Sequence, residues 1–269
     1  MAEEGWRAAL ELGFRRAGPR TVLTHRRHHG PLVVQRPFYP EGDVCHVYLL
    51  HPPGGVVAGD RLDIRVAADA GAEGLVTTPA AGKFYRSDGR TARQSVRLKV
   101  EAGAALEWLP QEAILYEGAR VASDTRIELT AGARFIGWEI LSLGRPASGE
   151  AFASGAVTLD GQILRDGTPL YLERFRLDPR AFRASWGLRG HAACGTLFAS
   201  PASEQSLNAV RELIGEEPGR GVTLIDGLLV CRVLEPRADR ARRFFLRVWK
   251  AIRLDVVGRA ACPPRIWAT

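Results

Sequence analysis

Apolar and polar residues alternate along three segments of the chain, at residues 61–66, 95–100 and 125–129. Each segment places an apolar side chain at every second position, with Arg, Asp, Lys or Glu among the residues between. A period of two is typical of a β-strand that has one buried face and one solvated face. All three segments are therefore predicted to be strands.

An Ala-Gly-Ala sequence follows each of these strands, at residues 70–72, 102–104 and 131–133. The central glycine can adopt the positive φ that a reversal requires, and the alanines keep the corner narrow. More continuously apolar strands follow the turns, which indicates burial on both faces. We predict a mainly β fold, layered or helically wound, built from repeated hairpin units over about residues 31–180. Three hairpins of an ordinary β-sandwich are the alternative.

The C-terminal third changes from strand to helix patterns, and about two α-helices are predicted there. Apolar residues recur at helical spacing between a serine cap at Ser203 and a glycine stop at Gly215. Two apolar runs flank Asp226-Gly227, the strongest short signal of a hairpin. A second helix follows Pro236 and reaches Arg253, with an apolar stripe that favours core packing. Helices and hairpin together span about residues 203–254.

Composition is that of an ordinary globular protein, with 269 residues of which 46% are hydrophobic. No Ser-, Gly- or Pro-dominated linker divides the chain, so a single domain over residues 1–269 is expected, with residues 1–30 as a variable N-terminal segment. The acidic start is unlike a secretory signal, and no apolar run approaches the ~18 residues of a membrane span. A cytoplasmic protein without a membrane partner is predicted.

The net charge is +7, from 37 Lys and Arg against 30 Asp and Glu. A basic protein attracts acidic partners. The arginines are spread along the whole chain, without a basic tail or a recognisable nucleic-acid-binding motif. An acidic protein is therefore the expected partner, and nucleic acid is not.

Common catalytic signatures are absent from the sequence, including G-x-S-x-G, H-E-x-x-H and the phosphate-binding loop. The glycine-rich stretch 51–61 lacks the lysine of a phosphate loop and leads into a strand instead of a helix. It is predicted to be a structural turn. These observations predict that the chain is not an enzyme.

Candidate metal ligands are scattered. His25, His28 and His29 lie among arginines, and the adjacent Cys45 and His46 should point to opposite faces of a strand. No four ligands converge as a structural metal site requires. No tightly bound cofactor is therefore expected.

Three carboxylates, Glu112, Glu139 and Glu173, are embedded in otherwise apolar predicted strands. A buried carboxylate is costly unless it is paired, hydrogen-bonded or bound to a metal. Ion pairs with arginine are the favoured interpretation, with Arg174 or Arg145 as partners. Asp60 and Asp63, at the glycine-rich turn, are expected to be exposed.

Several motifs occur in the order found in one known family. Residues 34–42, 51–62, 77–87, 106–112 and 137–140, the stretch Leu-Gly-Arg-Pro from Leu143 and the terminal Pro-Arg-Ile-Trp from Pro264 closely resemble the UreD (UreH) family of urease accessory proteins. The resemblance runs from about Gln35 to the C-terminus. Gly82 departs from the pattern, because a threonine is expected before Lys83 in many relatives.

The resemblance implies a β-rich, helically wound accessory protein that helps to insert nickel into apo-urease as a scaffold. The implied partners are UreF, UreG and the apo-urease subunits. It also implies a passage for nickel(II) in transit, which we assign to Asp60, Glu139 and Glu173, since oxygen ligands release a dication readily. Apolar surface for partners is expected at Phe38, Tyr39 and Trp267. The alternatives are a hydrolase on a β-scaffold and a basic module that binds nucleic acid or another acidic ligand.

Overall fold

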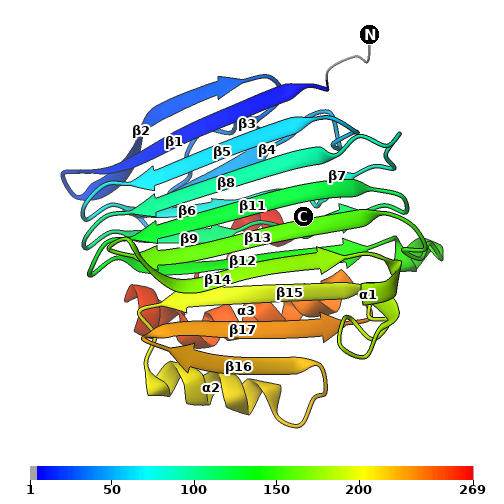
Figure 1. Cartoon of the computed structure of the whole chain (residues 1–269). Coiled ribbons are helices and arrows are strands. Elements are labelled where there is room, and N and C mark those ends of the chain that lie inside the picture. The colour runs from blue at the N-terminus through cyan, green and yellow to red at the C-terminus, as the bar shows by residue number, and fades with distance from the viewer. Residues whose placement is uncertain (1–4, 269) are drawn as a thin grey trace.

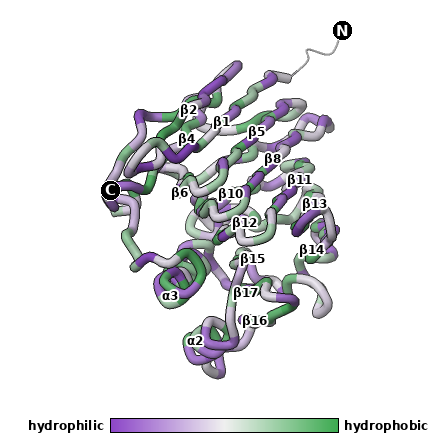
Figure 2. Tube along the Cα trace, turned by 90° about the vertical axis from the view of Figure 1, so that its left-hand side faces the viewer, coloured by the Kyte–Doolittle hydropathy of each residue, from purple (hydrophilic) through white to green (hydrophobic). Residues whose placement is uncertain are grey.

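Two β-sheets pack face to face, and helices cover the outer face of one of them (Figures 1 and 2). The computed structural model describes residues 5–268. Strands are its main elements, and successive coils stack their strands in two parallel layers, which confirms the predicted mainly β, helically wound fold. No helix in residues 5–268 is long and apolar enough to cross a membrane.

The seven-stranded sheet has the order β14-β13-β11-β8-β5-β1-β2. Its strands are β1 (Arg7–Ala17), β2 (Arg20–His29), β5 (Arg61–Ala68), β8 (Ala92–Val100), β11 (Arg120–Leu129), β13 (Ala156–Arg165) and β14 (Thr168–Leu177). Five of these strands run parallel to one another: β1, β5, β8, β11 and β13. The edge strands β2 and β14 are antiparallel to their neighbours.

The ten-stranded sheet has the order β16-β17-β15-β12-β9-β6-β4-β3; in addition, β10 pairs with β12, and β7 pairs with β10. Its strands are β3 (Val33–Val34), β4 (Cys45–Leu50), β6 (Glu73–Thr77), β7 (Gly82–Phe84), β9 (Ala105–Leu109), β10 (Ala113–Leu115), β12 (Arg134–Leu143), β15 (Ala193–Ser200), β16 (Arg220–Ile225) and β17 (Leu228–Glu235). The helices are α1 (Pro179–Arg183), α2 (Glu204–Ile214), α3 (Ala238–Val257) and the 3-10 turns Pro146–Ser148 and Arg265–Ala268.

The Ala-Gly-Ala turns carry the chain from one sheet to the other. The strands before the turns, β5, β8 and β11, pair with one another, and the strands after them, β6, β9 and β12, do the same. The repeated units are therefore arches and not the predicted hairpins. The physical reason is the last alanine of each turn, which is buried between the sheets and directs the chain into the second layer: Ala72, Ala104 and Ala133. Gly71 and its equivalents have φ near +70°, as the glycine argument required.

The N-terminal segment contributes two strands that the sequence analysis did not assign. Residues 1–4 of the predicted segment 1–30 lie outside the described residues. Strand β1 buries alternate residues, from Ala8 to Phe14, and lies parallel to β5. The same period of two that revealed β5 is present there, but no Ala-Gly-Ala turn follows it.

The predicted C-terminal elements are confirmed. Ser203 caps α2 by accepting a hydrogen bond from the Ser206 N–H, and Gly215 ends the helix. Asp226 and Gly227, both with positive φ, join β16 to β17. The second helix extends four residues beyond Arg253, and its apolar stripe packs on the ten-stranded sheet as core.

A buried cluster of charged side chains fastens α3 to the ten-stranded sheet and to the loop before β4. Arg253 is fully buried and forms ion pairs with Glu41, at 2.7 Å, and with Glu107 of β9, at 2.8 Å. The indole N–H of Trp249 also donates to Glu107, at 2.6 Å. Burial alone would raise the pKa of Glu41, but hydrogen bonds from His46 and Arg253 lower it to about 2. Glu41 is therefore ionised across the physiological range.

Replacing Arg253 by methionine should destabilise the protein by about 3–5 kcal/mol, because two buried carboxylates lose their counter-charge. Arg243 lies on the same helix and pairs with Asp239 at the surface. The matched change Arg243→Met should reduce stability by less than about 1 kcal/mol. Urea denaturation measures both effects, and equal losses would show that the buried cluster contributes no special stability.

Candidate functional site

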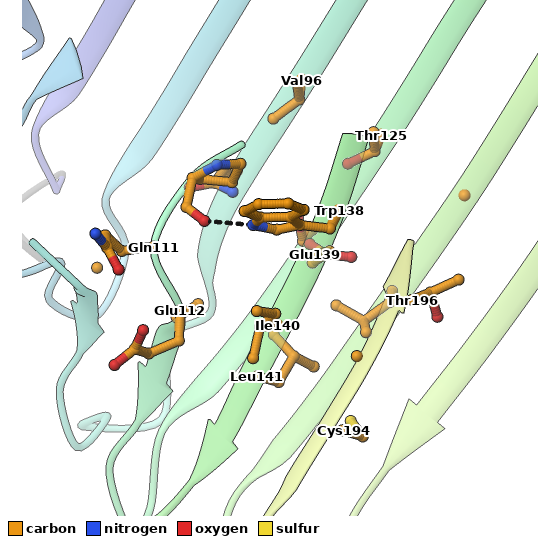
Figure 3. A pocket seen from close by; sticks show the side chains of 18 of the residues that line it. Val96, Gln111, Glu112, Thr125, Trp138, Glu139, Ile140, Leu141, Cys194 and Thr196 are labelled. Carbon is orange, nitrogen blue, oxygen red and sulfur yellow. Dashed lines mark hydrogen bonds between the residues drawn. The ribbon is translucent and has the colours of Figure 1, made fainter. Parts of the chain in front are cut away.

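A cavity of about 880 Å³ lies between the two sheets. Strands β8, β11, β13 and β14 line it from the seven-stranded sheet, and β12, β15 and β17 line it from the other. Figure 3 shows Val96 and Thr125 on one side, with Glu139 and Thr196 on strands of the facing sheet. At one edge, the indole N–H of Trp138 donates to the Pro110 carbonyl at 2.7 Å and fixes the loop before β10.

Strand register gathers the polar side chains of the cavity into bands. In the seven-stranded sheet, Thr125, Gly161 and Glu173 are aligned on neighbouring strands. In the ten-stranded sheet, the aligned residues are Glu139, Thr196 and Arg232. Apolar residues dominate the rest of the space between the sheets. The interior is thus a polar band within a hydrophobic layer.

Glu139 carries its carboxylate into this interior without a partner. No described residue forms a hydrogen bond or ion pair with that carboxylate. Burial raises the pKa of Glu139 to about 7, and the negative charge of Glu173 contributes to the same shift. At neutral pH the acidic and the ionised forms of the side chain are therefore both populated.

Glu173 joins the two sheets through an ion pair, and a tyrosine hydroxyl also donates a hydrogen bond to its carboxylate. Its carboxylate lies 2.5 Å from the Arg232 guanidinium of β17 and accepts a 2.7 Å hydrogen bond from the Tyr171 hydroxyl. Burial, followed by the hydrogen bond to Glu173, raises the pKa of Tyr171 above its ordinary value. The predicted pairing with arginine is therefore present for Glu173, but with a different arginine. Arg174 and Arg145 pair instead with Asp160 and Glu150.

Two further polar groups of the cavity were not predicted from the sequence. The Ser123 hydroxyl is buried and has no hydrogen-bond partner among the described residues. The Cys194 thiol also lines the cavity, and burial raises its pKa to about 12. Ser123 occupies one position in the alternation of β11, so its inward direction could have been inferred from Val121 and Ile127. Only the fold reveals that this position faces a cavity.

Asp60 lies outside the cavity lining and is buried, with 5% of its surface exposed. The prediction that it is exposed was wrong, whereas Asp63 is exposed as predicted. The Asp60 carboxylate accepts hydrogen bonds from the N–H of Trp6 at 2.8 Å and of Val57 at 3.0 Å. It holds the glycine-rich turn against the N-terminal segment. The structure therefore brings Glu139 and Glu173 together but leaves Asp60 apart.

The residues predicted to contact partners make internal contacts and are half-buried. Phe38 stacks on Tyr48 with ring centroids 4.8 Å apart, and burial, with a hydrogen bond to Cys45, raises the pKa of Tyr39 to about 12. Trp267 donates to the Thr77 hydroxyl at 2.9 Å and so anchors the C-terminal turn. Among residues 5–268, the most exposed large apolar side chain is Trp186, at 74%, which lies in the lining of the cavity.

The polar band does not form a dedicated metal centre. No group of three or more His, Cys, Asp or Glu side chains in residues 5–268 is arranged to hold a metal ion. Glu139 and Glu173 instead provide separate oxygen groups along the same cavity. Carboxylate oxygens suit hard and borderline dications, and a sparse set binds them weakly.

The raised pKa of Glu139 has a measurable consequence for stability. Because the folded state favours the neutral acid, the wild-type protein should lose stability as the pH rises from about 4.5 to about 7. Glu139→Gln removes this loss, so at pH 8 the variant should be more stable by up to about 3 kcal/mol. At pH 4 the two should be alike. Thermal unfolding across this range tests the expectation, with the exposed Glu212→Gln as a control that should follow the wild-type profile.

Comparison with known proteins identifies the family. The model of the UreD urease accessory protein family matches residues 7–268. Urease accessory protein UreD of Alkalilimnicola ehrlichii is 47% identical over 270 residues, covering 98% of this chain and 92% of the relative. The protein of the same name from Pseudomonas putida strain W619 is 47% identical, with 99% and 96% covered. A third, from Alcanivorax borkumensis, is 46% identical, with 99% and 93% covered. The chain therefore belongs to the UreD family of urease accessory proteins.

Proposed function

We propose that this chain acts in urease maturation as a scaffold without catalytic activity, and that its polar cavity conducts nickel(II) toward apo-urease. UreF and UreG are the proposed accessory partners. Family membership supports the accessory role. The observation that supports the conduit is the Glu139 carboxylate, which has no partner in residues 5–268 and faces the same cavity as Glu173.

A conduit needs groups that attract a cation but do not retain it. The pKa of Glu139 is about 7, so an arriving dication can displace the proton of the carboxyl group. A proton can return to the carboxylate when the dication leaves. Threonine hydroxyls at Thr125 and Thr196 add neutral oxygens on the two facing sheets. A buried hydroxyl without a protein partner, as in Ser123, is typical of a site served by water or a ligand.

The hydrolase alternative receives less support from the cavity. A hydrolase needs a nucleophile or an activated water held between an acid and a base. Glu139 has no partner within hydrogen-bond distance among the described residues, and the Cys194 thiol is kept protonated by burial. Glu173 does bond to Tyr171 and Arg232, but the raised pKa of the Tyr171 hydroxyl makes it a poor nucleophile, so this group does not form a catalytic set.

Reconstitution tests the accessory role. Apo-urease incubated with UreF, UreG, GTP, bicarbonate and nickel should become active only when this chain is also present. Without the chain, urease should remain assembled but poor in nickel, because the proposed path for the ion is missing. Metal analysis of the repurified urease measures the result, and full nickel occupancy without the chain would contradict the proposal.

Substitution in the cavity tests the conduit separately. Glu139→Gln should lower the rate of nickel loading about tenfold or more, the scale of loss found when groups that steer a metal are removed. Its complex with the accessory partners should still form, because the side chain lies inside the protein. Glu212→Gln, on the exposed face of α2, is the matched control and should load nickel normally.

Glu173→Gln distinguishes a conduit from a structural ion pair. As part of the conduit, Glu173 is needed for nickel loading and not for assembly. If the Glu173–Arg232 ion pair is structural instead, loss of the Glu173 carboxylate should reduce the yield of folded complex, since the Arg232 guanidinium loses its counter-charge. A pull-down beside a nickel measurement separates these outcomes. Normal assembly with normal loading in both variants would remove Glu139 and Glu173 from the proposed path.

A further inference from the structure

The solvent-facing surface of the seven-stranded sheet carries arginines in register on neighbouring strands. Arg65 of β5, Arg97 of β8 and Arg126 of β11 are directly aligned. Arg61 and Arg93 form a second aligned pair, four residues earlier on β5 and β8. Neighbouring strands lie about 4.8 Å apart, and like charges placed side by side at this spacing destabilise a sheet. The fold therefore maintains a repulsion on this face.

Internal carboxylates relieve only part of the repulsion. Arg97 pairs with Asp124, and Arg126 lies 2.6 Å from Glu128. Arg61, Arg65 and Arg93 are exposed and form no ion pair with any described residue. Three cationic groups on two adjacent strands thus lack a counter-charge within residues 5–268.

The aligned arginines line a shallow groove across the strands. Arg65, Arg97 and Arg126 form its floor with Lys99, and Glu11 and Glu128 also line it. We propose that this groove is a docking surface for a short acidic run of another protein chain. The inference is independent of nickel conduction, because this face points away from the cavity.

The pattern of charge on this face favours an acidic protein segment over nucleic acid. The arginine row is only three strands wide and ends at Glu11 on β1 and at the neutral Gln162 on β13. Between the two arginine rows, Asp63 and Asp124 share a further row. A continuous phosphate backbone longer than the row would meet these carboxylates and be repelled. Two or three neighbouring carboxylates on a protein chain match the row in length. They can pair with Arg65, which has no ion pair among the described residues, and share Arg97 and Arg126 with Asp124 and Glu128.

Binding of a defined probe tests the docking surface. A fluorescein-labelled peptide with four consecutive glutamates in a Gly-Ser background should bind the full chain, with an affinity that falls as salt rises. The double variant Arg65→Ser, Arg97→Ser should weaken binding about tenfold, as the loss of two charge-assisted contacts predicts. Fluorescence anisotropy measures the dissociation constants, and circular dichroism checks that the variant remains folded.

Two further variants make the result specific. Arg243→Ser with Arg247→Ser removes the same charge from the exposed face of α3 and should change the affinity by less than about twofold. Arg65→Lys with Arg97→Lys keeps the charge and should retain most of the binding. Equal losses in the two serine variants would overturn the proposal, because attraction would then depend only on net charge. Tighter binding of a single-stranded oligonucleotide that displaces the peptide would overturn it as well.

Discussion

Parallel stacking in register is the constraint on which the rest of this molecule depends. Because β5, β8, β11 and β13 align without slippage, a residue type at one position is placed beside its equivalent on the next strand. Apolar equivalents build the layer between the sheets. Polar equivalents are gathered outward in the same way, at Arg65 and Arg97. The inward polar residues also need antiparallel neighbours, since β14 places Glu173 beside the Thr125 row and β15 and β17 align Thr196 and Arg232 with Glu139.

The C-terminal third extends one sheet of this stack and covers that sheet with a helix. Strands β15, β17 and β16 extend one sheet beyond the other, and α3 covers the outer face of the larger sheet (Figures 1 and 2). Arg232 reaches across from this extension to Glu173, and Arg253 fastens the helix to Glu107 on the opposite side of the sheet. The C-terminal segment, which follows the last coil, therefore also lines the cavity between the sheets through β15 and β17.

Local patterns predicted the repeated strands and the two long helices, since period, capping and turn residues lie within a few neighbouring positions. Strands β1 and β2 were not assigned, because no Ala-Gly-Ala turn follows β1. Local patterns could not predict the arches. Whether the chain passes into the second layer at Gly71 and Ala72 depends on strands that are distant in sequence. For the site, the sequence indicated that Glu139 and Glu173 are embedded. Their shared cavity, the pairing with Arg232 and the burial of Asp60 depend on contacts between remote segments. The alternation of β11 indicates that Ser123 points inward, but only contacts between remote segments show that it faces a cavity.

The two antiparallel strands at the edges of the seven-stranded sheet have a consequence for how the molecule can grow. Strand β2 at one edge and β14 at the other reverse the direction that every coil between them follows. An additional coil could not be appended outside either strand and keep the parallel register. Beside β2, it would also meet a strand crowded with arginine and histidine, the kind of edge that resists further pairing. Lengthening by duplication is thus confined to the middle of the stack, where it would widen the cavity and the charged face together.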